Sequence, residues 1–387
     1  MANTIKEQDW RINTLKEDII TSVNKRVAGA VTNNSAAEKN LLLNDFEYST
    51  GKLHLESSPE GIGIGAHYNC NAKCIFCLGG KPRVFSLERY KNFFEPKLSP
   101  FISKARYLNL CGFGELLLMP GIEEFLDYVN ERTPGVNKIY TTNGTPLINS
   151  EFLTALTKGK SAIEVSLHAP QRQLHKALTR LDAFDQITAG IKRLTSLRKH
   201  KGYPTVVAVF LINTLNIESL PAFVEFAAEL GVDRVICNYM TVFHRAHLKF
   251  SCFFKQEITN DSFKRAEEIA QKLNFEIILP PKFGLDNNGA RQSRCSDPWK
   301  YFYVENESSV LPCCFAGEHV GYLEKAGFDT IWNGSHYKNL RNSLIQGRPS
   351  ESCRYCYKYH NNNVNDIRSH INSRPGFRDE ILKGHRL

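Results

Sequence analysis

Three cysteines that could share a metal centre lie within eight residues of one another. The run reads Cys70-Asn-Ala-Lys-Cys74-Ile-Phe-Cys77 and directly follows an apolar segment predicted as a strand. Thiolates at this spacing can bind three corners of an iron–sulfur cube from one loop, which leaves one iron open to a substrate or cofactor. A zinc site with one more distant ligand, or free buried cysteines, are the alternatives that the spacing leaves open.

A second group of cysteines lies near the other end of the chain. Cys295 and Cys313 are followed by Cys353 and Cys356, which form a C-x-x-C pair. The segment between the first two is predicted as a β-hairpin, which would bring its two ends together. Four thiolates are enough for a complete site, either a second cluster or a structural zinc. Cys314 is left over; a thiol beside a radical could donate a hydrogen atom, but a buried free cysteine is commoner.

The elements that must position these cysteines alternate in type from Gly61 onward. Six strands are predicted, at Gly61–Tyr68, Arg106–Cys111, Asn137–Thr142, Ala162–His168, Thr205–Asn213 and Arg234–Thr241. Five helices are predicted between them, at Ser86–Phe94, Gly121–Glu131, Ser150–Lys158, Asp182–Arg198 and Ser219–Leu230. This α/β pattern predicts a parallel sheet with helices outside, in the form of a partial (β/α)6 TIM-like barrel. Functional side chains of such barrels lie on loops at the carboxyl ends of the strands.

The chain is predicted to divide into five parts. They are an N-terminal helical extension (1–58), the barrel (59–245), a helix, a strand and a linker (246–293), a small cysteine-rich domain with a β-hairpin (294–357) and a polar tail (358–387). In the extension, apolar residues from Trp10 to Val23 predict a helix and the polar stretch Asn33–Asn40 predicts a loop. The tail is expected to be partly disordered or draped over the surface.

The first cysteine run resembles the CxxxCxxC signature of the radical S-adenosylmethionine (SAM) superfamily, including the aromatic Phe76 before the third cysteine. The resemblance covers about Gly61–Thr241. It implies a [4Fe–4S] cluster on Cys70, Cys74 and Cys77 with SAM on the open iron. It further implies cleavage of SAM to a 5′-deoxyadenosyl radical that abstracts a substrate hydrogen, with a flavodoxin- or ferredoxin-type electron donor.

The same resemblance implies SAM contacts at other strand ends. Cys111-Gly-Phe-Gly-Glu115 is similar to the GGE motif that receives the SAM amino group, although Phe113 and the leucines after Glu115 depart from it. Asn143 belongs to a Thr-Asn-Gly run that is common in the superfamily. Simple turns are the alternative for both motifs. The implied SAM-binding residues are Phe76, Gly112, Gly114, Glu115, Asn143, Ser166 and Asn213.

The second cysteine group resembles the SPASM/Twitch extension of radical SAM enzymes. The resemblance rests on Cys295-x-x-Pro-Trp, a hairpin that ends in Pro-Cys-Cys, Ile331-Trp-Asn and the final C-x-x-C. It implies an auxiliary [4Fe–4S] cluster on Cys295, Cys313, Cys353 and Cys356. The ligand layout is similar to that of the inosamine dehydrogenase of butirosin biosynthesis, which oxidises an aminocyclitol alcohol to a ketone.

Composition limits the other possibilities. The 387 residues are 42% hydrophobic and 23% charged with a net charge of +9, which is typical of a globular protein. The longest apolar stretch, Tyr203–Ile212, is far shorter than the roughly 20 residues of a spanning helix, so no membrane association is expected. No signal peptide is visible, which predicts a cytoplasmic protein, where eleven cysteines call for an explanation other than disulfides.

The sequence therefore predicts a radical SAM oxidoreductase that acts on a carbohydrate-like or other small polar substrate, with the auxiliary cluster as electron acceptor. A maturase that epimerises or crosslinks a ribosomal peptide or protein is the first alternative. A zinc-binding, non-catalytic protein that interacts with RNA or protein is the second. No aromatic-basic RNA-binding motif is present, so nucleic acid is not an expected partner.

Overall fold

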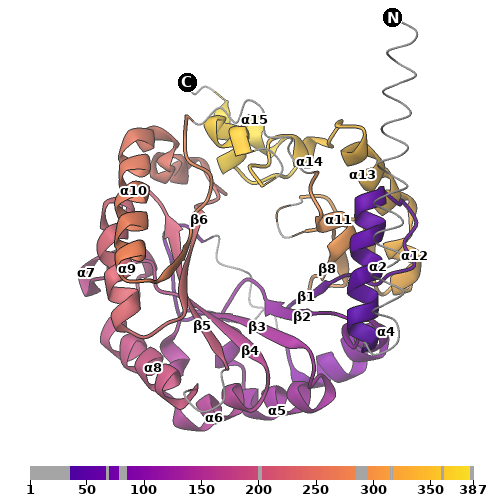
Figure 1. Cartoon of the computed structure of the whole chain (residues 1–387), viewed down its shortest axis with the longest axis horizontal. Coiled ribbons are helices and arrows are strands. Elements are labelled where there is room, and N and C mark those ends of the chain that lie inside the picture. The colour runs from indigo at the N-terminus through magenta and orange to yellow at the C-terminus, as the bar shows by residue number, and fades with distance from the viewer. Residues whose placement is uncertain are drawn as a thin grey trace, which may run out of the picture.

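The strands of this protein lie inside a ring of helices (Figure 1). The computed structural model describes residues 35–66, 69–77, 85–198, 203–284, 294–313, 315, 317–358 and 361–383, without the side chains of 150–152, 361 and 362. In these ranges ten strands form one sheet, in the order β10-β9-β8-β1-β2-β3-β4-β5-β6-β7. The sheet therefore joins the predicted barrel to the predicted cysteine-rich domain.

The predicted parallel α/β sheet is confirmed. Its six barrel strands are β1 (Gly61–Gly65), β2 (Tyr107–Cys111), β3 (Asn137–Thr142), β4 (Ser161–Ser166), β5 (Thr205–Ile212) and β6 (Arg234–Tyr239). Each is parallel to the next, and β7 (Glu276–Ile278) adds to the edge of β6. The outer helices are α5 (Ile122–Arg132), α6 (Ser150–Lys158), α7 (Arg172–Thr179), α8 (Phe184–Leu197), α9 (Leu220–Glu229) and α10 (Gln256–Lys272).

The first predicted barrel helix is longer than expected. It begins as α3 (Leu87–Arg89), passes through a π-helical turn at Tyr90–Phe94 and continues as α4 (Glu95–Ile102). Pro100 lies inside α4, where a proline normally breaks a helix. Leu98 and Ile102 are at most 1% exposed, and their burial in the core outweighs the loss of that backbone hydrogen bond.

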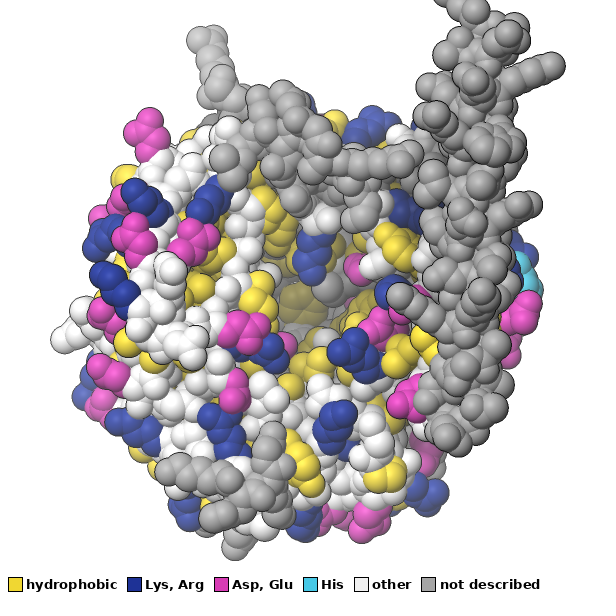
Figure 2. All heavy atoms as spheres, viewed as in Figure 1, with side chains coloured by type: hydrophobic (Ala, Val, Ile, Leu, Met, Phe, Trp, Pro, Cys, Tyr) yellow, Lys and Arg dark blue, Asp and Glu magenta, His cyan; other side chains and the backbone are white. Residues whose placement is uncertain are grey.

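Side chains alternate between the two faces of the barrel sheet. In β4, Ile163 and Val165 are fully buried in the core with residues of the helices, whereas Glu164 and Ser166 are partly exposed on the opposite face. We call the space enclosed by this inner face the lumen. Figure 2 shows the molecule hollowed at its centre, with hydrophobic side chains at the bottom of the hollow.

The glycines of β1 leave room for tyrosines in the lumen. A Cβ on Gly61 would lie 2.1 Å from the ring of Tyr107, and one on Gly63 would lie 2.3 Å from the hydroxyl of Tyr301. Both distances are far below van der Waals contact, so any larger side chain at these positions would displace the tyrosines.

The C-terminal part continues the same sheet. After α11 (Asp297–Lys300), the predicted hairpin is confirmed as β8 (Tyr301–Val304) and β9 (Ser309–Leu311), and β8 pairs in parallel with β1. The remaining elements are β10 (Gly321–Tyr322), α12 (Phe328–Trp332), α13 (Ser335–Ile345), α14 (Glu351–Arg354) and α15 (Phe377–Leu382). The division into five domains stays a prediction.

The N-terminal extension packs on the C-terminal part rather than on the barrel alone. Helix α2 (Ala36–Thr50) begins inside the predicted loop, because Ser35 and Glu38 form a capping box. Asn44 Nδ2 donates to the carbonyl of Trp299 (2.7 Å), and Tyr48 Oη donates to that of Arg294 (2.5 Å). The helix predicted at Trp10–Val23 lies outside the described residues.

The C-terminal tail is packed, so the expectation that it is draped over the surface was wrong. Val364, Ile367 and Ile371 are at most 2% exposed, and Ile371 forms a parallel bridge with Val242, just after β6. These aliphatic residues are few but lie on one side of the segment. In the described part of the chain, no helix has the length and apolar character needed to cross a membrane.

Candidate functional site

The loop after β1 holds the first three cysteines at the carboxyl end of the sheet. The backbone N–H groups of Lys73 and Ile75 donate to the carbonyls of Thr179 and Leu178, at 3.0 and 2.9 Å. These carbonyls end α7 and have no partner within their helix. Phe76 is 8% exposed in a hydrophobic cluster that includes Leu178 and Ile371. The loop is therefore anchored on both the barrel and the C-terminal tail.

The three thiols of this loop influence one another electrostatically. Burial raises the pKa of Cys74 to about 12, and the charges of Cys77 and Cys70 raise it further. Burial is also the main cause that raises the pKa of Cys70. Thiols in such surroundings stay protonated unless a metal compensates their charge, and three close thiols are a suitable donor set for an iron–sulfur cluster.

Glu115 links the loops that follow β2 and β3. Its side chain is 1% exposed, and its carboxylate accepts the N–H of Asn143 at 2.5 Å and that of Leu117 at 3.2 Å. Burial raises its pKa to about 7, although these hydrogen bonds lower it. At neutral pH the carboxylate therefore changes protonation state easily, which suits a group that would meet an ammonium.

Asn143 connects Glu115 to the cysteine loop. Its Nδ2 donates to Asn71 Oδ1 at 2.7 Å and approaches Cys70 Sγ at 3.7 Å. Its Oδ1 accepts the N–H and hydroxyl of Thr145, which fixes the turn. The structure thus brings Cys70, Glu115 and Asn143 together. Asn71 was missed by the sequence reasoning, and its position between two cysteines was the available signal.

The other predicted SAM contacts lie in different surroundings. Gly112 and Gly114 are exposed in the loop after β2, and Gly114 has a φ of 128°, which requires glycine. Ser166 ends β4 on the lumen side. Asn213 is fully buried, and its amide bonds Leu211 O and Leu215 N in its own turn, at 3.0 Å each. Its geometry favours a structural role, and its contact with SAM stays a prediction.

His168, two residues after the end of β4, packs against the cysteine loop. Its ring meets that of Phe76 edge to face, with centroids 5.2 Å apart, and its Nδ1 accepts the N–H of Leu211 at 3.1 Å. Burial lowers its pKa to about 3, so the imidazole is neutral. Its φ of 61° is unusual for a residue other than glycine.

The second cysteine group comes together through tertiary structure. Burial raises the pKa of Cys295 to about 12, and the charges of Asp297, Cys356 and Cys353 contribute. The pKa of Cys353 is raised to about 11 for the same reasons. Cys313 lies two residues after the end of β9 and affects the pKa of Tyr337, as Asp297 does. All four thiols therefore share one neighbourhood, while Cys314 lies outside the described residues.

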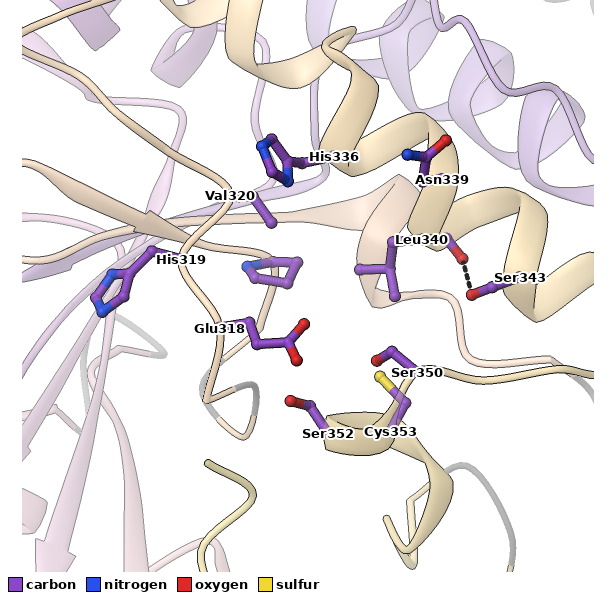
Figure 3. Close-up of a pocket in the computed structure, with 11 residues that line it drawn as sticks. Glu318, His319, Val320, His336, Asn339, Leu340, Ser343, Ser350, Ser352 and Cys353 are labelled. Atoms are coloured by element: carbon purple, nitrogen blue, oxygen red, sulfur yellow. Dashed lines mark hydrogen bonds between the residues drawn. The ribbon is translucent and has the colours of Figure 1, made fainter. Parts of the chain in front are cut away.

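A pocket of about 270 Å³ opens beside this group (Figure 3). The side chain of Glu318 points across it toward Ser352 and Cys353, whereas His319 points away. The charge of Glu318 also raises the pKa of Cys353. The described residues contain no three metal-binding side chains that already converge on one point, so the cysteines of both groups would turn into place on binding.

A larger cleft of about 670 Å³ lies between the β6–β7 edge of the sheet and the second cysteine group. Ile236 and Asn238 on the lumen side of β6 line it together with Cys295 and Tyr357. It connects the inner face of the barrel with the second cysteine group.

Comparison with known proteins gives the family. The SPASM iron–sulfur cluster-binding domain matches residues 295–357. A protein of Saccharolobus islandicus (strain Y.N.15.51 / Yellowstone #2), named probable GTP 3',8-cyclase, is 31% identical over 226 residues, covering 58% of this chain and 68% of the relative. The chain belongs to the radical SAM superfamily. The radical SAM enzyme described here therefore binds SAM with a [4Fe–4S] cluster, and its SPASM domain binds an auxiliary cluster.

Two solved structures have the same fold as this radical SAM enzyme. SuiB of Streptococcus suis has a TM-score of 0.60 and 16% identity, and the match covers 84% of this chain and 78% of SuiB. The structure of anSMEcpe with bound AdoMet and Cp18Cys peptide has a TM-score of 0.56 and 16% identity, and covers 84% of this chain and 94% of the other. At these identities the likeness concerns the fold alone.

Proposed function

We propose that this radical SAM enzyme oxidises a small polar, carbohydrate-like substrate in the lumen. After hydrogen abstraction, the substrate radical passes its electron to the auxiliary cluster and its hydroxyl proton to a base. The observation that carries the proposal is the complete set of four cysteines in the C-terminal domain. Four thiolates close a metal site, so it has no open position for a substrate. A closed cluster beside the lumen suits an electron acceptor better than a substrate-binding centre.

The residues of the chain have separable roles in this proposal. Cys70, Cys74 and Cys77 would hold the first cluster, and Glu115 with Asn143 would orient the SAM amino group. When bound, the cluster and SAM supply the radical that abstracts a substrate hydrogen. The lumen wall keeps water away from the reacting carbon and holds the substrate in place.

A peptide or protein maturase is the second candidate. Its support is the fold shared with SuiB and with anSMEcpe, both of which have been solved with peptides bound. In that reaction the substrate radical would end in a crosslink, an epimerised residue or an oxidised side chain. The relative's name makes GTP a further substrate to test.

The deciding experiment is a count of iron, sulfide and zinc in the anaerobically reconstituted protein. The proposal expects about eight iron and eight sulfide per chain, which corresponds to two cubanes. About four iron with one zinc would make the C-terminal site structural and leave no electron acceptor. The reconstituted enzyme is then offered sugars, aminocyclitols, GTP and peptides, and formation of 5′-deoxyadenosine together with a ketone product supports the oxidation.

A further inference from the structure

One row of residues in register crosses the strands of the lumen wall. The charged side chains of this wall belong to that row. The Cα positions of Thr141, Glu164, Val207, Arg234 and Glu276 are partners in register on β3 to β7. Glu164 lies between Ile163 and Val165, which are fully buried against the helices, so its carboxylate is on the lumen side. Among the lumen-facing positions of β1 to β6 in the described ranges, only Glu164 and Arg234 are charged.

Arg234 forms an ion pair with Glu276, whereas Glu164 has no ion-pair partner within 4 Å among the described residues. Arg234 Nη1 donates to both carboxylate oxygens of Glu276, at 3.2 and 3.3 Å. Within the described residues, the carboxylate of Glu164 accepts one hydrogen bond, from Thr141 Oγ1 at 3.1 Å. A carboxylate can accept about four hydrogen bonds, so most of this capacity is available in the lumen. Burial raises the pKa of Glu164, although the hydrogen bond from Thr141 and the nearby charge of Arg234 lower it.

Asn109 and two tyrosines lie on the same wall. Asn109 occupies a lumen position of β2, and its Oδ1 is buried without a hydrogen-bond partner in the described part of the chain. The rings of Tyr107 and Tyr301 stack nearby, with centroids 6.2 Å apart. Asn109 Oδ1 is covered by its neighbours, so this part of the wall offers a ligand chiefly the ring faces, which attract cations.

We infer that Glu164, held by Thr141, is the binding site for a protonated amino group of the substrate, and that the substrate is an amine-bearing polyol. This inference rests on the proposed function, since it assumes that the substrate occupies the lumen. Glu164 binds and positions the substrate, while hydrogen abstraction belongs to the SAM site.

The test compares three sugars that differ in one group: glucosamine, glucose and glucose 6-phosphate. Their binding to the reconstituted full-length enzyme is measured by anaerobic calorimetry in the absence of reductant. Glucosamine is expected to bind about tenfold more tightly than glucose, because its ammonium forms a charge-assisted hydrogen bond, and glucose 6-phosphate is expected to bind most weakly. Glu164→Gln should abolish the higher affinity for glucosamine over glucose, and Thr141→Val should reduce this affinity ratio by about threefold.

The control is Glu225→Gln, which changes an exposed carboxylate of the outer helix α9 and should leave the advantage intact. Iron content and thermal unfolding verify that each variant is folded. Absence of binding, equal binding of the three sugars, or a preference that survives Glu164→Gln would overturn the inference. Because binding is measured without turnover, failure to form a ketone would count against the proposed oxidation alone.

Discussion

The two cysteine groups of this enzyme are built in opposite ways. The first occupies a single loop, with Cys70 and Cys77 exposed and with hydrogen bonds to the end of one helix. The second extends from Cys295 to Cys356, with all four thiols partly buried and contributed by three separate segments. A local site of three ligands is accessible to a cofactor, whereas a site assembled from distant segments is closed and depends on the whole C-terminal fold.

The largest expected effect separates the two sites by metal content. Cys74→Ala should remove about four iron atoms per chain and reduce SAM cleavage to background, because the remaining two thiols cannot hold a cubane. Cys353→Ala should also remove about four iron atoms but leave SAM cleavage measurable. Iron, sulfide and 5′-deoxyadenosine are measured after anaerobic reconstitution. The buried Cys252→Ala is the matched control, and equal loss of SAM cleavage in both site variants would show that the sites are not independent.

A substitution in the core of the C-terminal part should lower the iron content of the second cysteine group before that of the first. Trp332 is 1% exposed, donates from Nε1 to Ser57 O at 3.0 Å and lies beside the buried Arg341. Trp332→Ala should cost about 3–5 kcal/mol of unfolding free energy through the cavity that it creates. Urea unfolding measures the loss, and iron content should fall in the C-terminal site before the first one. Ile331→Val is the control, with an expected cost of about 1 kcal/mol.

The packing of the C-terminal tail should make the stability of the protein depend on pH. His370 is 2% exposed, its Nε2 donates to Val364 O at 2.9 Å, and burial lowers its pKa to about 4. In the unfolded chain the imidazole binds a proton near pH 6.5, but in the folded protein it does so only near pH 4. The free energy of unfolding is therefore highest above pH 6.5 and falls by about 3 kcal/mol as the pH drops to about 4. His370→Gln should flatten this dependence in urea titrations, whereas the exposed His336→Gln should not.

A smaller effect is expected at the link between the barrel loops. Glu115→Gln removes the negative charge that would meet the SAM amino group. It also replaces one carboxylate oxygen, which accepts a backbone N–H, by an NH2 group that can only donate. SAM affinity should fall about tenfold, with the iron content of the first site retained. Equilibrium dialysis with SAM measures the change. Retention of affinity would assign Glu115 to loop structure alone, and Glu124→Gln on α5 is the surface control.

The sequence by itself determined the repeating architecture and the local chemistry. The six strands are found within three residues of their predicted ends, because each apolar run has the length and boundaries of a buried strand. The C-x-x-x-C-x-x-C spacing needs only one loop to be recognised, and the hairpin between Cys295 and Cys313 follows from its two short strands and polar turn.

Only the tertiary structure decided how distant residues meet. Nothing local shows that β8 pairs with β1, that the tail covers Phe76, or that α2 binds the backbone of Trp299. The inward direction of Glu164, and the pairing of Arg234 with Glu276 instead of with Glu164, depend on strand register across five strands. Such contacts join residues tens to hundreds of positions apart, and their free energy comes from burial and pairing that a local sequence pattern does not encode.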